Sequence, residues 1–261
     1  MTDAAFEALL AEGMGVDVEA AWGVGFLTGR YLHGVPPWTW PELAGPLMRR
    51  ADRALDMGTG DGSALAELAP FASLTVAYEE WLPTVPAAVR TLRPLGGHVV
   101  VALGSADNIG HSRAVPRLPF RGASFDLVLN RHEAFDPFDV RRLLSAGGSF
   151  VTQQVGHDQT ASVRALLGLP TTAGRAWCLD EAVRQVESAG LEVVNAGEAR
   201  PAGRFTDVAA LVAFLRSVPW EVPGFDLERF RPQLVRVHER CVMDGGAETV
   251  EHRFHLTARR D

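Results

Sequence analysis

The chain has 261 residues, of which 47% are hydrophobic and 22% are charged, a balance that supports a full buried core and excludes a disordered chain. Its 32 aspartates and glutamates outnumber its 25 lysines and arginines, and the net charge of −7 gives nucleic-acid binding no support without excluding it. No apolar run approaches the roughly 20 residues of a membrane span, and the two distant cysteines form no metal-type pair, so we expect a cytoplasmic protein with no membrane partner and no metal.

Helices and an irregular loop rich in Gly, Pro and Trp are expected over the first 50 residues, where Pro41 begins a short helix that ends at Arg50. From Ala51 the pattern changes, because short apolar strands alternate with helices. This alternation predicts a parallel sheet that is covered on both faces and binds its ligand beyond the carboxyl ends of the strands. The expected strands are residues 53–57, 74–79, 98–103, 125–130 and 149–155, with helices over 62–69, 84–93 and 137–146.

Beyond residue 155 the pattern is less regular. A turn at Asp244, Gly245 and Gly246 precedes residues 247–258, in which apolar and polar residues alternate as in a half-buried strand. The other expected elements are helices over 180–189, 207–217 and 226–242 and a strand over 191–199.

A glycine-rich turn follows the first strand directly, since Asp56 leads into Gly58, Gly60 and Gly62. Glycines let backbone N–H groups come close to a ligand, and the start of the following helix favours a negatively charged group. The dinucleotide-binding motif has a glycine at the position of Ser63, and the phosphate loop of nucleoside triphosphate sites has a lysine that this loop lacks. By itself the loop leaves a nucleotide-like ligand and an ordinary glycine-rich turn as alternatives.

The second strand ends at Glu79, whose carboxylate can accept hydrogen bonds from both hydroxyls of a ribose. We prefer Glu79 to Glu80 for this role, because Glu80 falls one step farther into the connection to the next helix. The alternative is that both are a solvated acidic pair at the start of that helix.

The Asp-x-Gly-x-Gly-x-Gly spacing of residues 56–62 resembles motif I of the class I methyltransferases. The segments LPF (118–120) with SFDLVLN (124–130), and RLLSAGGSFVTQQ (142–154), resemble the fourth-strand and fifth-strand segments of small-molecule methyltransferases, with Ala146 in place of the usual proline. The match covers about residues 50–155, and the chain is similar to bacterial small-molecule-type methyltransferases of the type 11-like group. The resemblance implies an α/β, Rossmann-like, doubly wound seven-stranded sheet, mostly parallel with the last strand antiparallel, and S-adenosylmethionine as methyl donor.

The domain organisation expected from this resemblance has four parts. They are an N-terminal helical cap (1–50), an S-adenosylmethionine-binding core (51–200), a helical lid (201–246) and a last core strand (247–261).

The resemblance also implies which residues contact the donor. Asp107 and the Ala106 backbone are the best match to the pair that contacts the adenine in this family. An extra stretch, residues 108–117, separates them from LPF. The alternative is that Asp107 caps a loop. The full expected set is Asp56, Gly58, Thr59, Gly60, Gly62, Glu79, Ala106, Asp107 and Asn130.

The residues after the fourth strand face the reactive methyl group in this fold. His132 is our candidate general base, because histidine titrates near neutral pH, and Glu133 can orient it or contact the substrate. The alternative is that His132 packs against the next helix and Glu133 caps it. Gln153 and Gln154 are further polar candidates past the fifth strand.

The leading hypothesis is therefore an S-adenosylmethionine-dependent methyltransferase with an unidentified small-molecule acceptor. The Pro-Pro-aromatic sequence typical of base or glutamine N-methylation does not follow Asn130. An RNA or protein methyltransferase remains an alternative and would show a basic surface near the strand ends. A non-catalytic S-adenosylmethionine-binding protein is another, whereas Ser63 argues against a nicotinamide oxidoreductase.

Overall fold

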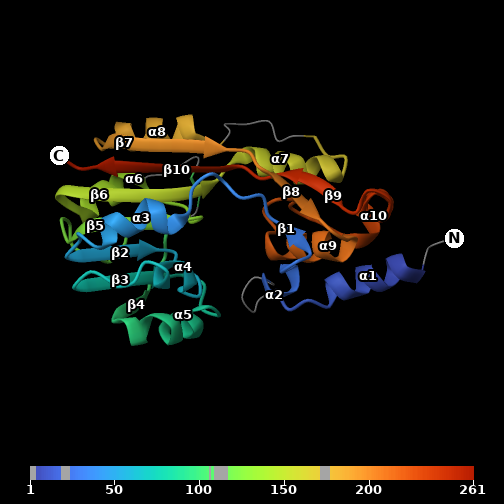
Figure 1. The fold of residues 1–261 in the computed structure, drawn as a ribbon, viewed down its shortest axis with the longest axis horizontal. Helices are drawn as coiled ribbons and strands as arrows, with labels where there is room; N and C mark the ends of the chain where they lie inside the picture. The colour runs from blue at the N-terminus through green and yellow to red at the C-terminus, as the bar shows by residue number, and fades with distance from the viewer. Residues whose placement is uncertain (1–3, 19–23, 106, 109–116, 171–176) are drawn as a thin grey trace. The chain divides into compact units, whose positions relative to one another are not determined.

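The computed structural model describes residues 4–18, 24–105, 107, 108, 117–170 and 177–261 (Figure 1). The chain forms two compact units, each with a sheet of its own. The larger, which we call the sheet unit, consists of Pro37–Gly156, Arg175–Ala199 and Arg253–Asp261, and the smaller unit of Met1–Pro36, His157–Gly174 and Arg200–His252.

The sheet unit is built on a seven-stranded sheet. Its strands are β2 (Arg53–Met57), β3 (Leu74–Glu79), β4 (Gly97–Val101), β5 (Phe125–Arg131), β6 (Leu144–Val155), β7 (Glu192–Ala199) and β10 (Arg253–Arg259). Their order is β4-β3-β2-β5-β6-β10-β7, in which the first five strands are parallel and β10 runs antiparallel to both of its neighbours. From β2 the chain winds outward in both directions, so the topological switch point lies between β2 and β5. This confirms the predicted doubly wound, mostly parallel sheet.

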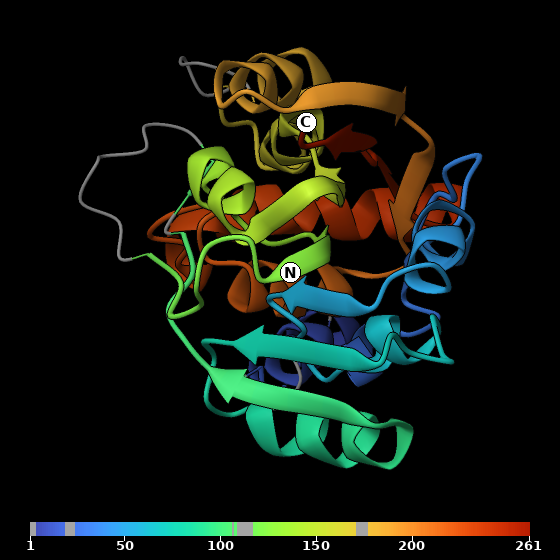
Figure 2. The same cartoon turned by 90° about the vertical axis from the view of Figure 1, so that its left-hand side faces the viewer.

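The two faces of this sheet bury different side chains, because successive residues of a strand point to opposite sides. On one face, Leu55, Val128 and Phe150 pack with side chains of α6 (Pro137–Leu143) and α8 (Leu179–Ser188). On the other face, Ala54 and Leu127 pack with side chains of α3 (Trp40–Met48), α4 (Ser63–Ala66) and α5 (Val85–Leu92). Figure 2 shows α5 alongside β4, to which the 3₁₀ turn η2 (Arg93–Leu95) connects it.

The smaller unit combines a three-stranded antiparallel sheet with helices. Helix α9 is buried along most of its length, its N-terminus is capped by Asp207, and Gly13 lets α1 approach its backbone closely. No helix in the described part of the chain is long and apolar enough to cross a membrane. The elements are α1 (Ala4–Met14), α2 (Val24–Leu27), β1 (Tyr31–Leu32), α7 (His157–Leu166), β8 (Ala202–Phe205), α9 (Val208–Ser217), α10 (Leu227–Asp244) and β9 (Ala247–Val250).

The prediction of one strand over residues 247–258 is wrong. The structure divides it into β9, in the three-stranded sheet, and β10, in the seven-stranded sheet. The division falls at Glu251 and His252, which are buried polar residues. The Glu251 backbone N–H donates to Pro201 O, which continues the β8–β9 register by one residue, and its carboxylate accepts from the Tyr31 hydroxyl. Strand β10 then begins at Arg253. The turn residue Gly245 instead ends α10 in the left-handed conformation.

The helix predicted over residues 137–146 ends earlier, at Leu143, and β6 begins at Leu144 instead of Ser149. Gly147, with φ of 73°, lies inside the strand, where its N–H donates to Arg260 O at 2.7 Å. Gly147 and Gly148, which as glycines just after the predicted helix were expected to end it, therefore lie in an irregular start of β6. The structure also adds α7 and the short strands β1 and β8 in segments that had been assigned no regular element.

Candidate functional site

The loop after β2 turns back on itself through three glycines. Gly58, Gly60 and Gly62 have φ values of 64°, 60° and 81°, which other residues rarely adopt. The turn is closed by a hydrogen bond from Gly62 N to Thr59 O at 3.0 Å, and Thr59 N donates to Tyr78 O of β3 at 3.0 Å. The glycines predicted from the motif thus do form a tight loop at the carboxyl edge of the sheet.

Glu79 joins the ends of β2 and β3. Its buried carboxylate accepts from the backbone N–H of Gly60 at 2.6 Å and from that of Trp81 at 2.7 Å. Glu80 is exposed and accepts instead from Gly104 N at 2.8 Å, in the loop after β4. Of the two glutamates, the structure therefore brings Glu79 to the glycine loop.

Glu133 packs against the same loop. A Cβ placed on Gly58 would lie 2.6 Å from Glu133 Oε2, so the space above this glycine is filled by the glutamate. Burial, reinforced by the charges of Glu80 and Glu79, raises the pKa of Glu133 to about 8. Burial likewise raises the pKa of Asp56 to about 7. Since burial and the charges of neighbouring glutamates raise the pKa values of Asp56 and Glu133, a cation close to either carboxyl would favour its ionised form.

Asn130 lies fully buried at the end of β5. Its Oδ1 accepts from Thr152 Oγ1 at 2.7 Å and from Gln154 Nε2 at 2.6 Å. Its Nδ2 has no hydrogen-bond partner among the described residues. A buried amide donor rarely stays unsatisfied, so this group is suited to contact a ligand.

His132 has a left-handed backbone conformation, with φ of 62°, immediately after β5. Its backbone N–H donates to Gln153 O at 2.8 Å, and its exposed imidazole Nε2 lies 3.0 Å from Gln153 Nε2. Gln153 in turn accepts at Oε1 from Trp38 Nε1 at 3.0 Å. The sequence reasoning had placed Trp38 in the cap, whereas the structure places it in the sheet unit, and no local motif indicates its long-range contact.

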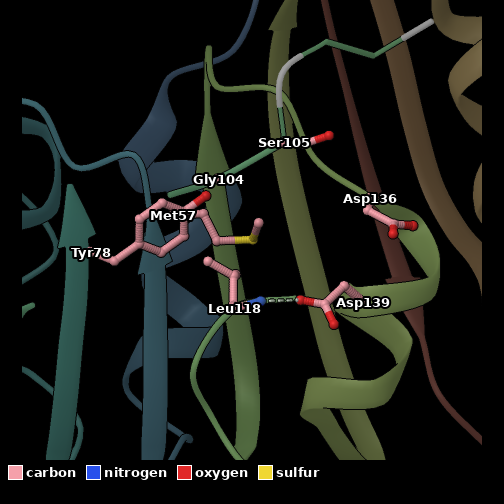
Figure 3. A pocket seen from close by; sticks show the side chains of 7 residues that line it. All are labelled: Met57, Tyr78, Gly104, Ser105, Leu118, Asp136 and Asp139. Atoms are coloured by element: carbon pink, nitrogen blue, oxygen red, sulfur yellow. Dashed lines mark hydrogen bonds between the residues drawn. The ribbon is translucent and has the colours of Figure 1, made fainter. Parts of the chain in front are cut away.

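Ala106 and Asp107, which we expected to contact the adenine, follow β4 in the chain. Ala106 lies outside the described residues, and Asp107 is exposed, with its carbonyl 3.2 Å from Ser105 Oγ. A small pocket opens beside this loop (Figure 3), and its lining includes the buried Tyr78, whose hydroxyl has no hydrogen-bond partner among the described residues. Sequence reasoning missed Tyr78, because it reads as an ordinary apolar strand residue. The lining residues are Met57, Tyr78, Gly104, Ser105, Leu118, Asp136 and Asp139.

These residues occupy the carboxyl ends of neighbouring strands, at the topological switch point where ligands of such sheets bind. Of the predicted site residues, the structure places Glu79 against Gly60 and Glu133 against Gly58, around one loop. Among the described residues, no three His, Cys, Asp or Glu side chains are placed to hold a metal ion.

Solved structures of other proteins have a similar fold. No family model matches the sequence, and no curated protein matches it. YcgJ from Bacillus subtilis has a similar structure, with a TM-score of 0.57 and 14% identity over 84% of this chain and 98% of that one. A candidate methyltransferase from Bacillus halodurans C-125 gives a TM-score of 0.55 and 16% identity over 82% of this chain and 97% of that one. With the strand order described above, these likenesses show that the chain shares the doubly wound α/β fold of these two proteins, the second of which is described as a candidate methyltransferase.

Proposed function

We propose that the protein is an S-adenosylmethionine-dependent methyltransferase with a small-molecule acceptor. The observation that carries the proposal is the Glu79 carboxylate, buried at the end of β3 and hydrogen-bonded to Gly60 of the glycine loop. A carboxylate has about four acceptor positions, and two backbone N–H groups use only part of that capacity. The remainder suits the two hydroxyls of the donor's ribose.

The other residues around the loop fit the same donor. At Gly60, a Cβ would meet no described atom within 4 Å, so the backbone there faces open space that a ligand can fill. Asn130 Nδ2 offers a buried N–H without a partner among the described residues. We assign donor binding to Asp56, Gly58, Thr59, Gly60, Gly62, Glu79, Asp107 and Asn130, with Ala106 as a further proposed contact.

Charge supports a cationic donor. S-adenosylmethionine, when bound, supplies an electrophilic methyl group on a positively charged sulfur. Asp56 and Glu133, whose pKa values burial raises, would both be favoured in their ionised forms by that charge. The enzyme's main task is then alignment of the acceptor with the methyl group, because the sulfonium is already a good leaving group. We propose that His132 and Glu133, which follow β5, contact the acceptor.

The experiment that tests the proposed function is a transfer assay. The protein is incubated with methyl-labelled S-adenosylmethionine and a panel of small carboxylic acids, phenols, alcohols and amines, and mass spectrometry follows S-adenosylhomocysteine and labelled product. We expect stoichiometric formation of both with at least one acceptor class, and loss of both in the Glu79→Ala variant. Tight donor binding without any transfer would instead identify a non-catalytic binding protein.

A further inference from the structure

The side chain of Gln153, at the end of β6, lies between two ring systems. Its Oε1 is 3.0 Å from the indole nitrogen of Trp38, and its Nε2 is 3.0 Å from the imidazole Nε2 of His132. Gln153 is buried, with 5% of its surface exposed, and its backbone carbonyl accepts the His132 N–H as well. The glutamine therefore holds His132 by both main chain and side chain.

The chemistry of the three groups determines where the imidazole proton lies. The indole N–H of Trp38 can only donate, so the group of Gln153 that faces it must be the carbonyl oxygen. The amide NH₂ of Gln153 then faces His132, and this group also can only donate. His132 Nε2 must accept, which leaves its single proton on Nδ1. A doubly protonated ring would bring two N–H groups to within 3.0 Å of each other.

Trp38 also contacts β10, the strand next to β6 in the sheet. The ring of His255, on β10, meets the Trp38 ring edge-on with their centroids 4.6 Å apart, and His255 pairs with Gln153 in the sheet register. Burial lowers the pKa of His255, so this ring is uncharged at neutral pH. Gly197 of β7 leaves room for it, because a Cβ there would lie 2.6 Å from His255 Nε2.

We infer that Gln153, oriented by Trp38, is a positioning residue that holds His132 in its neutral Nδ1–H tautomer. With its Nε2 lone pair engaged by Gln153, His132 does not take a proton from the acceptor at that nitrogen. The tautomer of His132 does not depend on the proposed function, and only its role in methyl transfer rests on that proposal. We call the chain of contacts from His132 through Gln153 and Trp38 to His255 the relay. Its titratable neighbours are Arg131 and Glu133, on either side of His132 in the chain, and its own member His255 on β10 is titratable as well.

The inference restricts the chemistry of the acceptor. The new bond forms between an acceptor lone pair and the methyl carbon, while the carbon–sulfur bond breaks and its electron pair goes to sulfur. No proton passes to His132 in this step, so the acceptor must present a lone pair that needs no deprotonation by this ring. This modifies the hypothesis, drawn from the sequence, that His132 is a general base.

The decisive variant is Gln153→Glu, which preserves the size of the side chain. A carboxylate accepts from both sides, so it keeps the bond to Trp38 and now requires N–H at His132 Nε2. Nitrogen-15 chemical shifts of the imidazoles are measured in the whole protein, with His132 assigned by loss of its signals in a His132→Asn variant. We expect Nδ1–H with unprotonated Nε2 in the wild type, and Nε2–H with a titration midpoint raised by about one pH unit or more in Gln153→Glu.

Two tryptophan variants form a matched pair. Trp38→Phe removes the donor that orients Gln153, and we expect the His132 signals to change to a mixture of tautomers. Trp177→Phe removes a similar contact, from Trp177 Nε1 to Gln154 Oε1 at 3.3 Å, and should leave the His132 signals unchanged. If Gln153→Glu proves unstable, Trp38→Phe still tests the inference.

The kinetic counterpart uses the acceptor found in the transfer assay. Gln153→Glu should lower kcat while leaving the KM for the donor within about twofold, and its pH–rate profile should gain an ionisation that the wild type lacks. Nε2–H in the wild type, or unchanged His132 signals in Gln153→Glu, would overturn the inference. Failure of the protein to bind the donor would refute the proposed function, and the tautomer measurement would still stand.

Discussion

The loop after β2 and the segment after β5 both turn sharply at the end of a strand, but they do so with different residues. Both follow a buried parallel strand, and both pass through left-handed backbone conformations at the carboxyl edge of the sheet. The β2 loop uses glycines, for which this conformation costs little. The β5 segment uses His132, for which it costs about 1–3 kcal/mol and needs compensating contacts such as those from Gln153. The first site can be recognised from its residues, whereas the second depends on partners distant in the chain.

The largest effect is expected on the β2 side, from Glu79→Ala. This change leaves the N–H groups of Gly60 and Trp81 without their carboxylate and removes the proposed ribose acceptor. Hydrogen bonds to charged groups contribute about 1.5–3 kcal/mol each, so the dissociation constant for S-adenosylmethionine should rise by about 100-fold or more. Calorimetric titration measures it. Glu80→Ala, which removes an exposed carboxylate, should change it by less than about fivefold, and equal losses in both variants would refute the assignment of Glu79.

A second pair of variants compares two glycines of the same loop. Gly58→Ala places a Cβ against the Glu133 side chain at a φ of 64°, so strain and overpacking add to about 2–4 kcal/mol of lost stability. Gly60→Ala has a similar φ of 60° but faces open space, and should cost only about 1 kcal/mol. Urea unfolding followed by circular dichroism gives both values. A larger loss for Gly60→Ala would contradict the described packing of Glu133.

The pH dependence of donor binding tests the link between the two regions. Because the pKa of Glu133 is raised to about 8, the folded chain holds this proton more tightly than the unfolded chain, and its contribution to stability falls as the pH rises toward 8. A cationic donor favours the ionised form, so affinity for S-adenosylmethionine should increase severalfold from pH 6 to pH 8.5.

S-adenosylhomocysteine, which lacks the sulfonium charge, is the matched control ligand for this measurement. Its affinity should vary less over the same pH range, and Glu133→Gln should reduce the difference between the two ligands. An equal pH dependence for both ligands in the wild type would argue against a role for Glu133 in sensing the donor's charge.

The smallest effect is expected from Gly197→Ala, beside His255 at the end of the relay that starts at His132. The added Cβ displaces the His255 ring and with it the edge-on contact to Trp38, at a cost of about 1 kcal/mol or less. Imidazole nitrogen-15 signals of His255 and His132 should both shift. Gly203→Ala, which crowds Thr249 in the smaller unit, is the matched control and should leave both sets of signals in place.

Local patterns were sufficient for the sheet and for its glycine loop. Apolar strands, the spacing from Asp56 to Gly62 and the carboxylate of Glu79 are close in sequence to the elements they define, so the parallel strands and the tight loop could be predicted from them, whereas the seventh strand and the antiparallel one were expected only from the family resemblance. The break between β9 and β10 could not be predicted, because apolar and polar residues keep alternating through Glu251 and His252.

The tautomer of His132 could not be predicted from the sequence either. It depends on Gln153, 21 residues away, and on Trp38, which is 115 residues from Gln153. A histidine after the fourth parallel strand suggests a base by residue type alone. The tautomer that we infer follows from donors and acceptors that only the three-dimensional arrangement brings together.

The central claim, a donor site for S-adenosylmethionine at the carboxyl ends of β2, β3 and β5, is tested most directly by calorimetry. S-adenosylmethionine, S-adenosylhomocysteine and NAD are titrated in parallel into the wild-type protein and into Glu79→Ala. We predict saturable one-to-one binding of both methionine nucleotides to the wild type, about 100-fold weaker binding to the variant, and no binding of NAD. Binding of NAD with no binding of either methionine nucleotide would contradict the account.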